Sequence, residues 1–111
     1  MKYLVLVLIG VVACWADNPL TGTWNCANVP DSGPQNSWTL TIHEDGDNLT
    51  GTLTNGEVEI PVSDIKAKDT SVSFRFTMSD SSYQFTGKVQ QRTLDGRYSG
   101  EERGALRCEK P

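Results

Sequence analysis

The sequence predicts an all-β domain, an antiparallel eight-stranded up-and-down (meander) barrel closed by a disulfide. Three observations lead to this fold class. Beyond residue 16, apolar and polar residues alternate with a period of two in short segments, which turn signals separate about every ten residues. No window there repeats apolar residues at the spacing of three and four that a helix would show. Two cysteines, Cys26 and Cys108, would tie the first of these segments to the last.

Residues 1–16 have the pattern of a signal peptide. Lys2 supplies a positive charge, and residues 4–13 form an apolar run that is too short to span a bilayer. Small residues at positions 14 and 16 predict cleavage before Asp17. We therefore expect residues 17–111 to form a single secreted domain with no transmembrane segment.

An alternative processing route stays open at this end of the chain. Residues 11–14 fit a permissive bacterial lipobox, in which Cys14 would become a lipid-modified first residue and the protein an anchored bacterial lipoprotein. Both routes place the protein outside the cytoplasm. Both also leave Cys26 and Cys108 as a pair, and a pair of cysteines in an exported chain is expected to form a disulfide.

The position of this disulfide favours a closed barrel over an open sandwich. Cys26 falls on the same strand face as Trp24, and Cys108 on the same face as Leu106. If both apolar faces point inward, the two sulfur atoms lie on the same side of the first and last strands. A bond between them requires these strands to be neighbours, which closes the barrel and removes both unpaired edges.

The expected strands follow the alternation along the chain, and short turns suited to hairpins separate most of them. Asp45-Gly46 is one such turn, and Asn55-Gly56 is the strongest hairpin signal in the chain. Neighbours in sequence should therefore be antiparallel neighbours in space. The expected strands cover residues 22–26, 38–43, 49–54, 58–62, 72–78, 83–89, 94–98 and 106–108.

Two kinds of irregularity are expected within these strands. Pro61 cannot donate to a ladder, and the apolar phase shifts after it toward Ile65, so this strand should be bulged. Gly51, Gly87 and Gly96 fall on the inward face. They would either remove volume from the barrel interior or permit sharp strand bends.

The inward face is apolar and rich in aromatic residues. A barrel of eight strands is wide enough to hold its own side chains or one small ligand, and both readings are open for this interior. The aromatic candidates for contact with a ligand are Trp24, Trp38, Phe74, Phe76, Tyr83 and Tyr98. The full inward set adds Leu40, Ile42, Leu49, Leu53, Val58, Ile60, Val62, Val72, Met78, Phe85, Val89, Leu94 and Leu106.

One link is too long for a tight hairpin. Residues 27–37 form a polar stretch, and Cys26 anchors its base. Exposed loops on a rigid scaffold are common binding sites, and a plain connector is the alternative. The loop residues that would meet a partner are Pro30, Asp31, Ser32, Gly33 and Pro34.

Short motifs in three of the expected strands resemble those of the avidin/streptavidin family. Residues 20–24 read Leu-Thr-Gly-Thr-Trp, residues 48–52 read Asn-Leu-Thr-Gly-Thr, and residues 85–87 read Phe-Thr-Gly. Similar motifs also occur in lipocalin-like and bacterial exported barrels. The resemblance implies a small meander barrel of the calycin kind that carries a ligand.

The biotin-site residues of that family are not matched here. The positions that alternate after Trp24 are Cys26, Asn28 and Pro30, where the family places polar ligands of biotin. Leu53 stands where the family has a tyrosine, and Phe74 where it has a tryptophan. The resemblance therefore supports the barrel and does not extend to biotin.

Composition and motifs argue against several other functions. The net charge of −4 includes no basic patch of the kind that nucleic acid requires. His43 is the only histidine, is expected to face solvent beside a turn, and has no converging partners for catalysis or metal binding. We expect no enzyme activity, no cofactor and no metal. Asn48 begins an Asn-Leu-Thr sequon and is a candidate for glycosylation.

The sequence thus favours a secreted binding protein that holds a small apolar ligand in the mouth of the barrel. The inward face offers few hydrogen-bonding groups beyond Tyr83 and Tyr98, and burying a polar ligand without partners is costly. The alternative is a protein whose surface loop contacts an extracellular partner, as in a protease inhibitor or an adhesion factor. The oligomeric state stays open.

Overall fold

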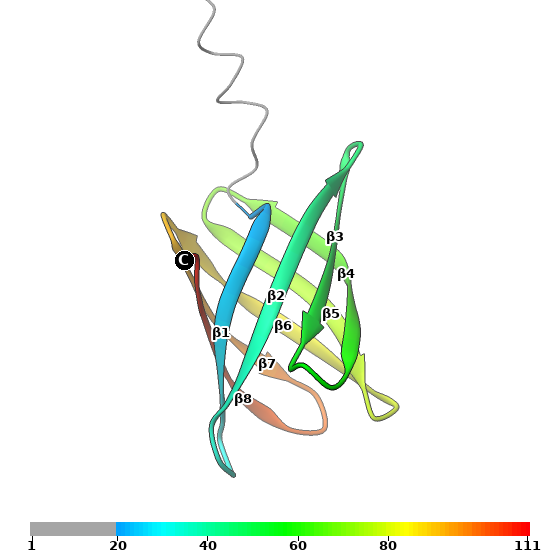
Figure 1. Ribbon diagram of the computed structural model, residues 1–111, viewed down its shortest axis with the longest axis vertical. Coiled ribbons are helices and arrows are strands. Elements are labelled where there is room, and N and C mark those ends of the chain that lie inside the picture. Colours follow the sequence, from blue (N-terminus) through cyan, green and yellow to red (C-terminus); the bar gives the residue numbers. More distant parts are fainter. Residues whose placement is uncertain (1–19) are drawn as a thin grey trace, which may run out of the picture.

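The computed structural model describes residues 20–111, which form a closed barrel of antiparallel strands (Figure 1). Each strand pairs with the next along the chain, and the first also pairs with the last. The predicted fold class is therefore confirmed. The signal peptide, the cleavage site before Asp17 and the alternative lipid anchor at Cys14 lie outside the described residues. The eight strands are β1 Gly22–Pro30, β2 Asn36–Asp45, β3 Asn48–Thr54, β4 Glu59–Lys68, β5 Ser71–Met78, β6 Ser81–Gln90, β7 Thr93–Ser99 and β8 Arg103–Glu109.

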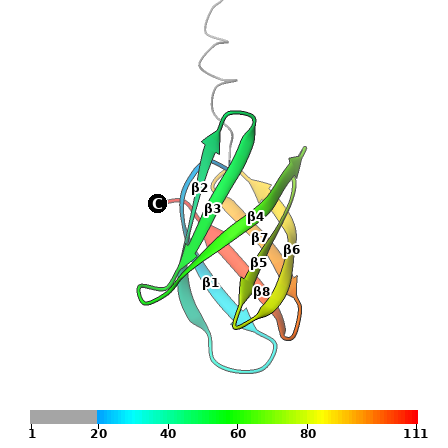
Figure 2. The same ribbon diagram turned by 90° about the vertical axis from the view of Figure 1, so that its right-hand side faces the viewer.

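The up-and-down order divides the turns between two ends of the barrel (Figures 1 and 2). The turns β1–β2, β3–β4, β5–β6 and β7–β8 lie at one end, which we call the mouth. The turns β2–β3, β4–β5 and β6–β7 lie at the other end, together with the start of β1, and we call this the closed end. Within residues 20–111 there is no helix long and apolar enough to cross a membrane.

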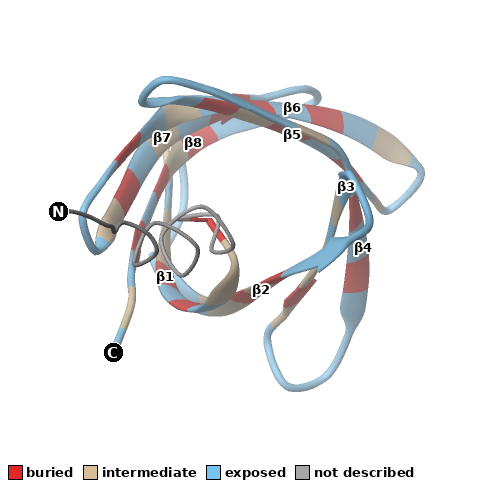
Figure 3. Cartoon of the chain, turned by 90° about the horizontal axis from the view of Figure 1, so that it is seen from above, coloured by how far each residue is buried: buried red, intermediate tan, exposed pale blue. Residues whose placement is uncertain are grey.

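The core follows the period-two pattern of the strands, with buried residues alternating with exposed ones along the strands (Figure 3). Trp24, Phe74 and Phe85 are the largest side chains that are fully buried. The rings of Phe74 and Phe85, which are paired across β5 and β6, stack with their centroids 4.5 Å apart. No polar or charged residue among residues 20–111 is classed as buried, so apolar burial dominates the interior.

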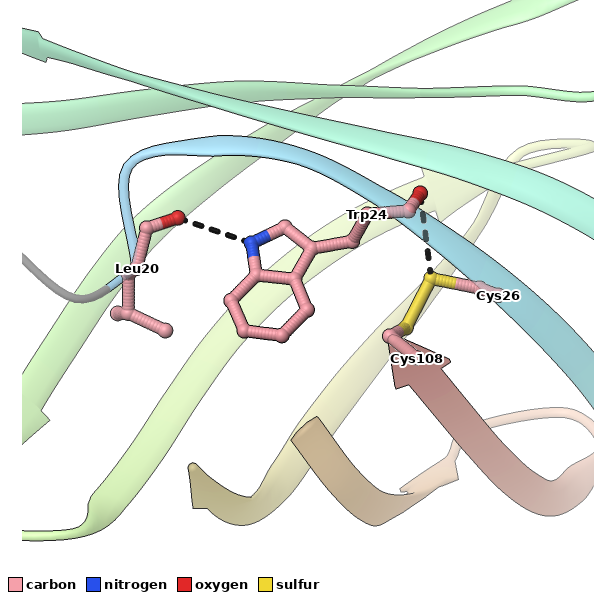
Figure 4. Close-up of a disulfide and its surroundings, with 4 residues drawn as sticks. All are labelled: Leu20, Trp24, Cys26 and Cys108. Carbon is pink, nitrogen blue, oxygen red and sulfur yellow. Dashed lines mark hydrogen bonds between the residues drawn. A yellow bond between two sulfur atoms is a disulfide. The ribbon is translucent and has the colours of Figure 1, made fainter. Parts of the chain in front are cut away.

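The disulfide joins directly paired residues of β1 and β8 (Figure 4). Cys26 lies opposite Cys108 in the ladder, and the S–S distance is 2.03 Å. Both side chains are buried, at 5% and 1% exposure. The argument from strand faces, which placed both sulfur atoms inside and made the terminal strands neighbours, is confirmed.

Phe85 explains two of the inward glycines. Gly87 and Gly96 lie opposite each other in β6 and β7, and the Phe85 ring packs over both. A Cβ atom at Gly87 would lie 2.7 Å from the ring and 2.3 Å from the backbone oxygen of Asp95. These glycines therefore remove volume so that one large ring fits against the sheet. They do not leave the interior empty.

The irregular strand is β4. Pro61 pairs with Thr52 of β3, while pairing with β5 begins only at Val62. A register shift between Ser63 and Lys66 forms the predicted bulge, and Asp64 adopts a positive φ of 52° within it. Beyond this point β4 no longer pairs with β3.

Val58 corrects the predicted inward set. It is 50% exposed and lies in the β3–β4 turn, because β4 begins one residue later at Glu59. The Asn55 side chain accepts hydrogen bonds from the amides of Glu57 and Val58, and the Thr54 hydroxyl donates to the Val58 carbonyl. These bonds build a wider turn than a two-residue hairpin, and they hold Val58 away from the core.

Candidate functional site

The two ends of the barrel differ in how they are filled. At the closed end, Leu20 and Trp24 are both fully buried, and the Trp24 indole donates a 2.9 Å hydrogen bond to the Leu20 carbonyl (Figure 4). The Lys110 ammonium lies 5.0 Å from the centre of the Trp24 ring and donates to the Thr21 carbonyl at 2.8 Å. Chain and side chains together plug this end.

The mouth instead opens into a cavity of about 370 Å³, which we call the mouth cavity. This volume lies within the range of small-molecule sites. Its apolar walls come from β2, β3, β5, β6, β7 and β8, and its rim comes from the turns, from β1 and from the start of β2. The walls are Trp38, Leu53, Phe76, Met78, Tyr83, Tyr98 and Leu106, and the rim comprises Asn28, Pro30, Ser32, Gly33, Pro34, Asn36, Ser79, Glu101 and Glu102.

Three aromatic rings form the continuous part of the wall. Phe76 of β5 lies opposite Tyr83 of β6, and their rings stack with centroids 5.2 Å apart. Tyr98 of β7 meets both rings edge-on, at 6.4 Å from Phe76 and 6.0 Å from Tyr83. Such contacts hold the rings in fixed positions, so the wall is preorganised for a flat apolar group.

The two tyrosine hydroxyls are the polar points on this wall. Tyr98 donates a 2.7 Å hydrogen bond to the side-chain oxygen of Asn28. Burial raises the pKa of Tyr98 above its ordinary value of 10.0, against the lowering effect of this hydrogen bond. Burial also raises the pKa of Tyr83, and the charges of Glu102 and Glu101 raise it further. Both hydroxyls therefore stay protonated at neutral pH.

Four of the six aromatic candidates line the mouth cavity: Trp38, Phe76, Tyr83 and Tyr98. Trp38 is half-buried, and its indole donates to the Asn36 side chain at 2.7 Å, which directs the ring to the rim. Trp24 and Phe74 are fully buried and do not line the cavity, because Trp24 plugs the closed end and Phe74 stacks on Phe85 in the middle of the core.

The predicted long loop is shorter than expected. Residues 27–30 continue β1 and residues 36–37 begin β2, so the turn covers only residues 31–35. Ala27 and Asn28 pair with both β2 and β8, and Val29 and Pro30 pair with β8. The polar composition of these residues concealed a strand, because their ladder partners are supplied from the other end of the chain.

This turn belongs to the same site as the barrel interior. Ser32, Gly33 and Pro34 lie on the rim of the mouth cavity. The turn is fixed to the neighbouring strands β7 and β8 by Asp31, whose two carboxylate oxygens accept from Arg97 at 2.7 and 2.8 Å and whose amide donates to the Arg103 carbonyl at 2.9 Å. A ligand in the barrel mouth would contact both the walls and this turn.

Alternation alone could have found part of the rim. Asn28 has the same strand parity as Trp24 and Cys26, so it points inward, and the extended β1 brings it to the mouth. Glu101 and Glu102 follow β7 in the β7–β8 turn, which meander order places at the same end as residues 31–35. No sequence signal assigned these turn residues to a cavity rather than to solvent.

A second hollow, of about 780 Å³, lies between the β2–β3 hairpin and β4, where the two strands separate beyond the bulge. It is mostly polar and opens widely to solvent, and it contains Glu44, Asp47 and Asp64. Within the described part of the chain, no group of three His, Cys, Asp or Glu side chains is arranged to hold a metal ion. The mouth cavity is therefore the better candidate site.

Comparison with known proteins gives no match. No family model, no curated protein and no solved structure matches this chain. The function must therefore be argued from the geometry of the barrel.

Two other residues singled out in the sequence lie on the surface. His43 is exposed on β2, and Asn48 is exposed at the start of β3, where a glycan would be accessible.

Proposed function

We propose that this protein is a secreted binding protein that holds a small, largely apolar ligand in the mouth cavity. The observation that carries the proposal is the asymmetry between the two ends. Leu20 and Trp24 are fully buried inside the barrel at the closed end, whereas at the mouth a cavity of about 370 Å³ opens between Phe76, Tyr83 and Tyr98.

The wall chemistry supports a ligand with an apolar body. Phe76, Tyr83 and Tyr98 present ring surface, and Leu53 and Leu106 complete the floor. The Tyr98 hydroxyl is already bonded to Asn28, so the wall has few donors left for a sugar or a nucleotide. Polar contacts are available at the rim, where a ligand could keep one polar group.

Titration with N-phenyl-1-naphthylamine tests the proposal, because this neutral dye gains fluorescence on entering an apolar site. We expect saturable binding at one dye per barrel. The matched variants are Phe76→Leu and Phe74→Leu, which remove the same ring from neighbouring inward positions of β5. Only Phe76 lines the cavity, so Phe76→Leu should weaken binding by about tenfold, the scale of one lost aromatic contact.

Phe74→Leu is expected to lower stability and to leave the dissociation constant within about twofold while the protein stays folded. Saturable binding that responds equally to both variants would contradict the mouth as the site. Native mass spectrometry of protein from its own source complements the titration. A mass that departs on denaturation would identify the bound molecule, whereas a bare mass would direct attention to a macromolecular partner of residues 31–35.

A further inference from the structure

The mouth cavity has an uneven distribution of charge. Among the residues that line it, Glu101 and Glu102 are acidic, and none is Lys, Arg or His. Both glutamates belong to the β7–β8 turn and are exposed at the rim. The remaining lining is neutral, so the charged residues that line the cavity are all negative.

Asp31, an acid of the β1–β2 turn, is paired with a cation, while Glu101 and Glu102 are not part of an ion pair. Asp31 forms an ion pair with Arg97 at 2.7 Å, which occupies that guanidinium at the edge of the mouth. Glu101 accepts a 3.2 Å hydrogen bond from the Ser81 hydroxyl, a neutral partner. Among residues 20–111 the ion pairs are Arg97–Asp31 and Arg75–Asp64, and neither includes Glu101 or Glu102.

The two carboxylates stand next to the aromatic wall. Glu101 and Glu102 line the same cavity as Tyr83 and Tyr98, and Glu101 is bonded to Ser81, which lies two residues before Tyr83 in β6. The charges of both glutamates raise the pKa of Tyr83. Aromatic faces carry partial negative charge and attract cations, and this attraction is stronger where water is excluded. Ring faces and carboxylates therefore favour the same kind of group at the same place.

We propose that the ligand of the mouth cavity is an organic amine, with an apolar or aromatic body between Phe76 and Tyr98 and a protonated amino group at the rim beside Glu101 and Glu102. This inference rests on the proposed function of the mouth as a ligand site. A cationic ligand satisfies both conditions of the site, because its body is buried and its charge stays partly hydrated near an opposite charge. An anion of the same shape would be repelled by the same carboxylates.

The size of the cavity narrows the ligand class. A volume of about 370 Å³ is near the lower limit of small-molecule sites, which suits an amine with one or two rings better than a long-chain lipid. The stacked pair Phe76 and Tyr83 and the edge-on Tyr98 provide a flat wall, which suits a planar body.

Three probes of nearly equal shape separate charge from apolar binding: 2-phenylethylamine, 2-phenylethanol and phenylacetate. Isothermal titration calorimetry gives the affinities, and amide and aromatic chemical shifts locate the site. We expect the amine to bind about tenfold more tightly than the alcohol, and the carboxylate to bind most weakly. In Glu101→Gln/Glu102→Gln, the preference for the amine over the alcohol should fall to within about twofold, with the affinity for the alcohol unchanged.

Glu44→Gln/Glu109→Gln is the matched control, because it removes the same total charge from exposed positions near the closed end. It should retain the preference for the amine. Equal binding of amine and alcohol, or a preference that persists in Glu101→Gln/Glu102→Gln, would overturn the amine inference and leave the mouth as an apolar site. If none of the three probes shifts the resonances of Phe76, Tyr83 and Tyr98, both proposals fail together.

Discussion

Removal of the disulfide should cost this barrel a large part of its stability. The bond spans 82 residues, and the chain-entropy model assigns a crosslink over such a loop about 4.5 kcal/mol at 25 °C. Cys26→Ala/Cys108→Ala is the appropriate variant, because both side chains are buried and serine would place two hydroxyls in an apolar interior. For a domain of this size the expected fall in Tm is about 20–35 °C.

The native barrel should persist in this variant. The β1–β8 ladder pairs residues from Asn25 with Glu109 to Pro30 with Gly104, and these backbone bonds do not depend on the sulfur atoms. The loss of stability should therefore come mainly from the unfolded chain, which gains freedom when the crosslink is removed. A larger m-value in urea is the signature of that expansion.

Urea unfolding followed by tryptophan fluorescence measures both quantities, with reduced wild-type protein as the control. The variant and the reduced protein should agree within about 1 kcal/mol. A loss below about 1.5 kcal/mol with an unchanged m-value would refute the reasoning, because it would mean that the ends of the chain stay together in the unfolded state without the bond.

Three further changes test other parts of the structure. Gly87→Ala should lower the free energy of unfolding in urea by about 3 kcal/mol or more, because the added Cβ would lie 2.3–2.8 Å from backbone and ring atoms. A cost below about 1 kcal/mol would contradict this packing. Trp24→Phe loses the hydrogen bond to Leu20, so it should lower the free energy of unfolding by about 1–2 kcal/mol and speed amide hydrogen exchange at the start of β1. Unchanged exchange there would contradict the role of Trp24 in holding this end of the chain. Because burial raises the folded pKa of Tyr98 above 10.0, the stability it contributes is full below pH 10.0 and is lost as pH rises through the folded pKa. Tyr98→Phe should flatten this alkaline decline, measured by urea unfolding from about pH 9 to about pH 12, and an equally steep decline would assign it to other groups.

The strands and the barrel closure could be predicted because both depend on information local to a strand. Period-two alternation defines which face is buried, and that face is the same for Trp24 and Cys26 whatever the partner strands are. The pairing of Cys26 with Cys108 then follows from parity and from the expectation that the chain is exported. The bulge after Pro61 was visible as a change of phase.

The errors occurred where hydrogen bonds that the alternation does not reveal decide the structure. Residues 27–30 look like a loop because Ala27 and Val29 break the apolar phase of the strand and Pro30 follows, but β8 supplies their ladder from residues 104–107. Val58 looks like a core residue by its parity, but the side chain of Asn55 builds a turn that displaces it. Local pattern cannot supply either fact, because each depends on a competing set of hydrogen bonds.

The candidate site could be predicted only in part, for a related reason. The alternation marks Phe76, Tyr83 and Tyr98 as inward, but it does not say which end of the interior is filled. That depends on how far each inward ring stands along the barrel axis. Phe85 fills the middle with Phe74 because Gly87 and Gly96 make room for its ring, whereas the rings of Phe76, Tyr83 and Tyr98 pack against one another at the wall and leave a cavity at the mouth.

The two ends of the barrel thus differ in structure: contacts at one end hold the start of β1, and contacts at the other end surround the mouth cavity. The start of β1 is tied by Trp24 and Lys110, so these contacts at the closed end contribute stability. The Asp31–Arg97 pair and the Tyr98–Asn28 bond fix the mouth in an open shape, because they connect the β1–β2 side to β7 without crossing the cavity. An interior that is filled at one end and held open at the other can bind a small molecule without refolding, which removes the ordering cost that a flexible site would carry.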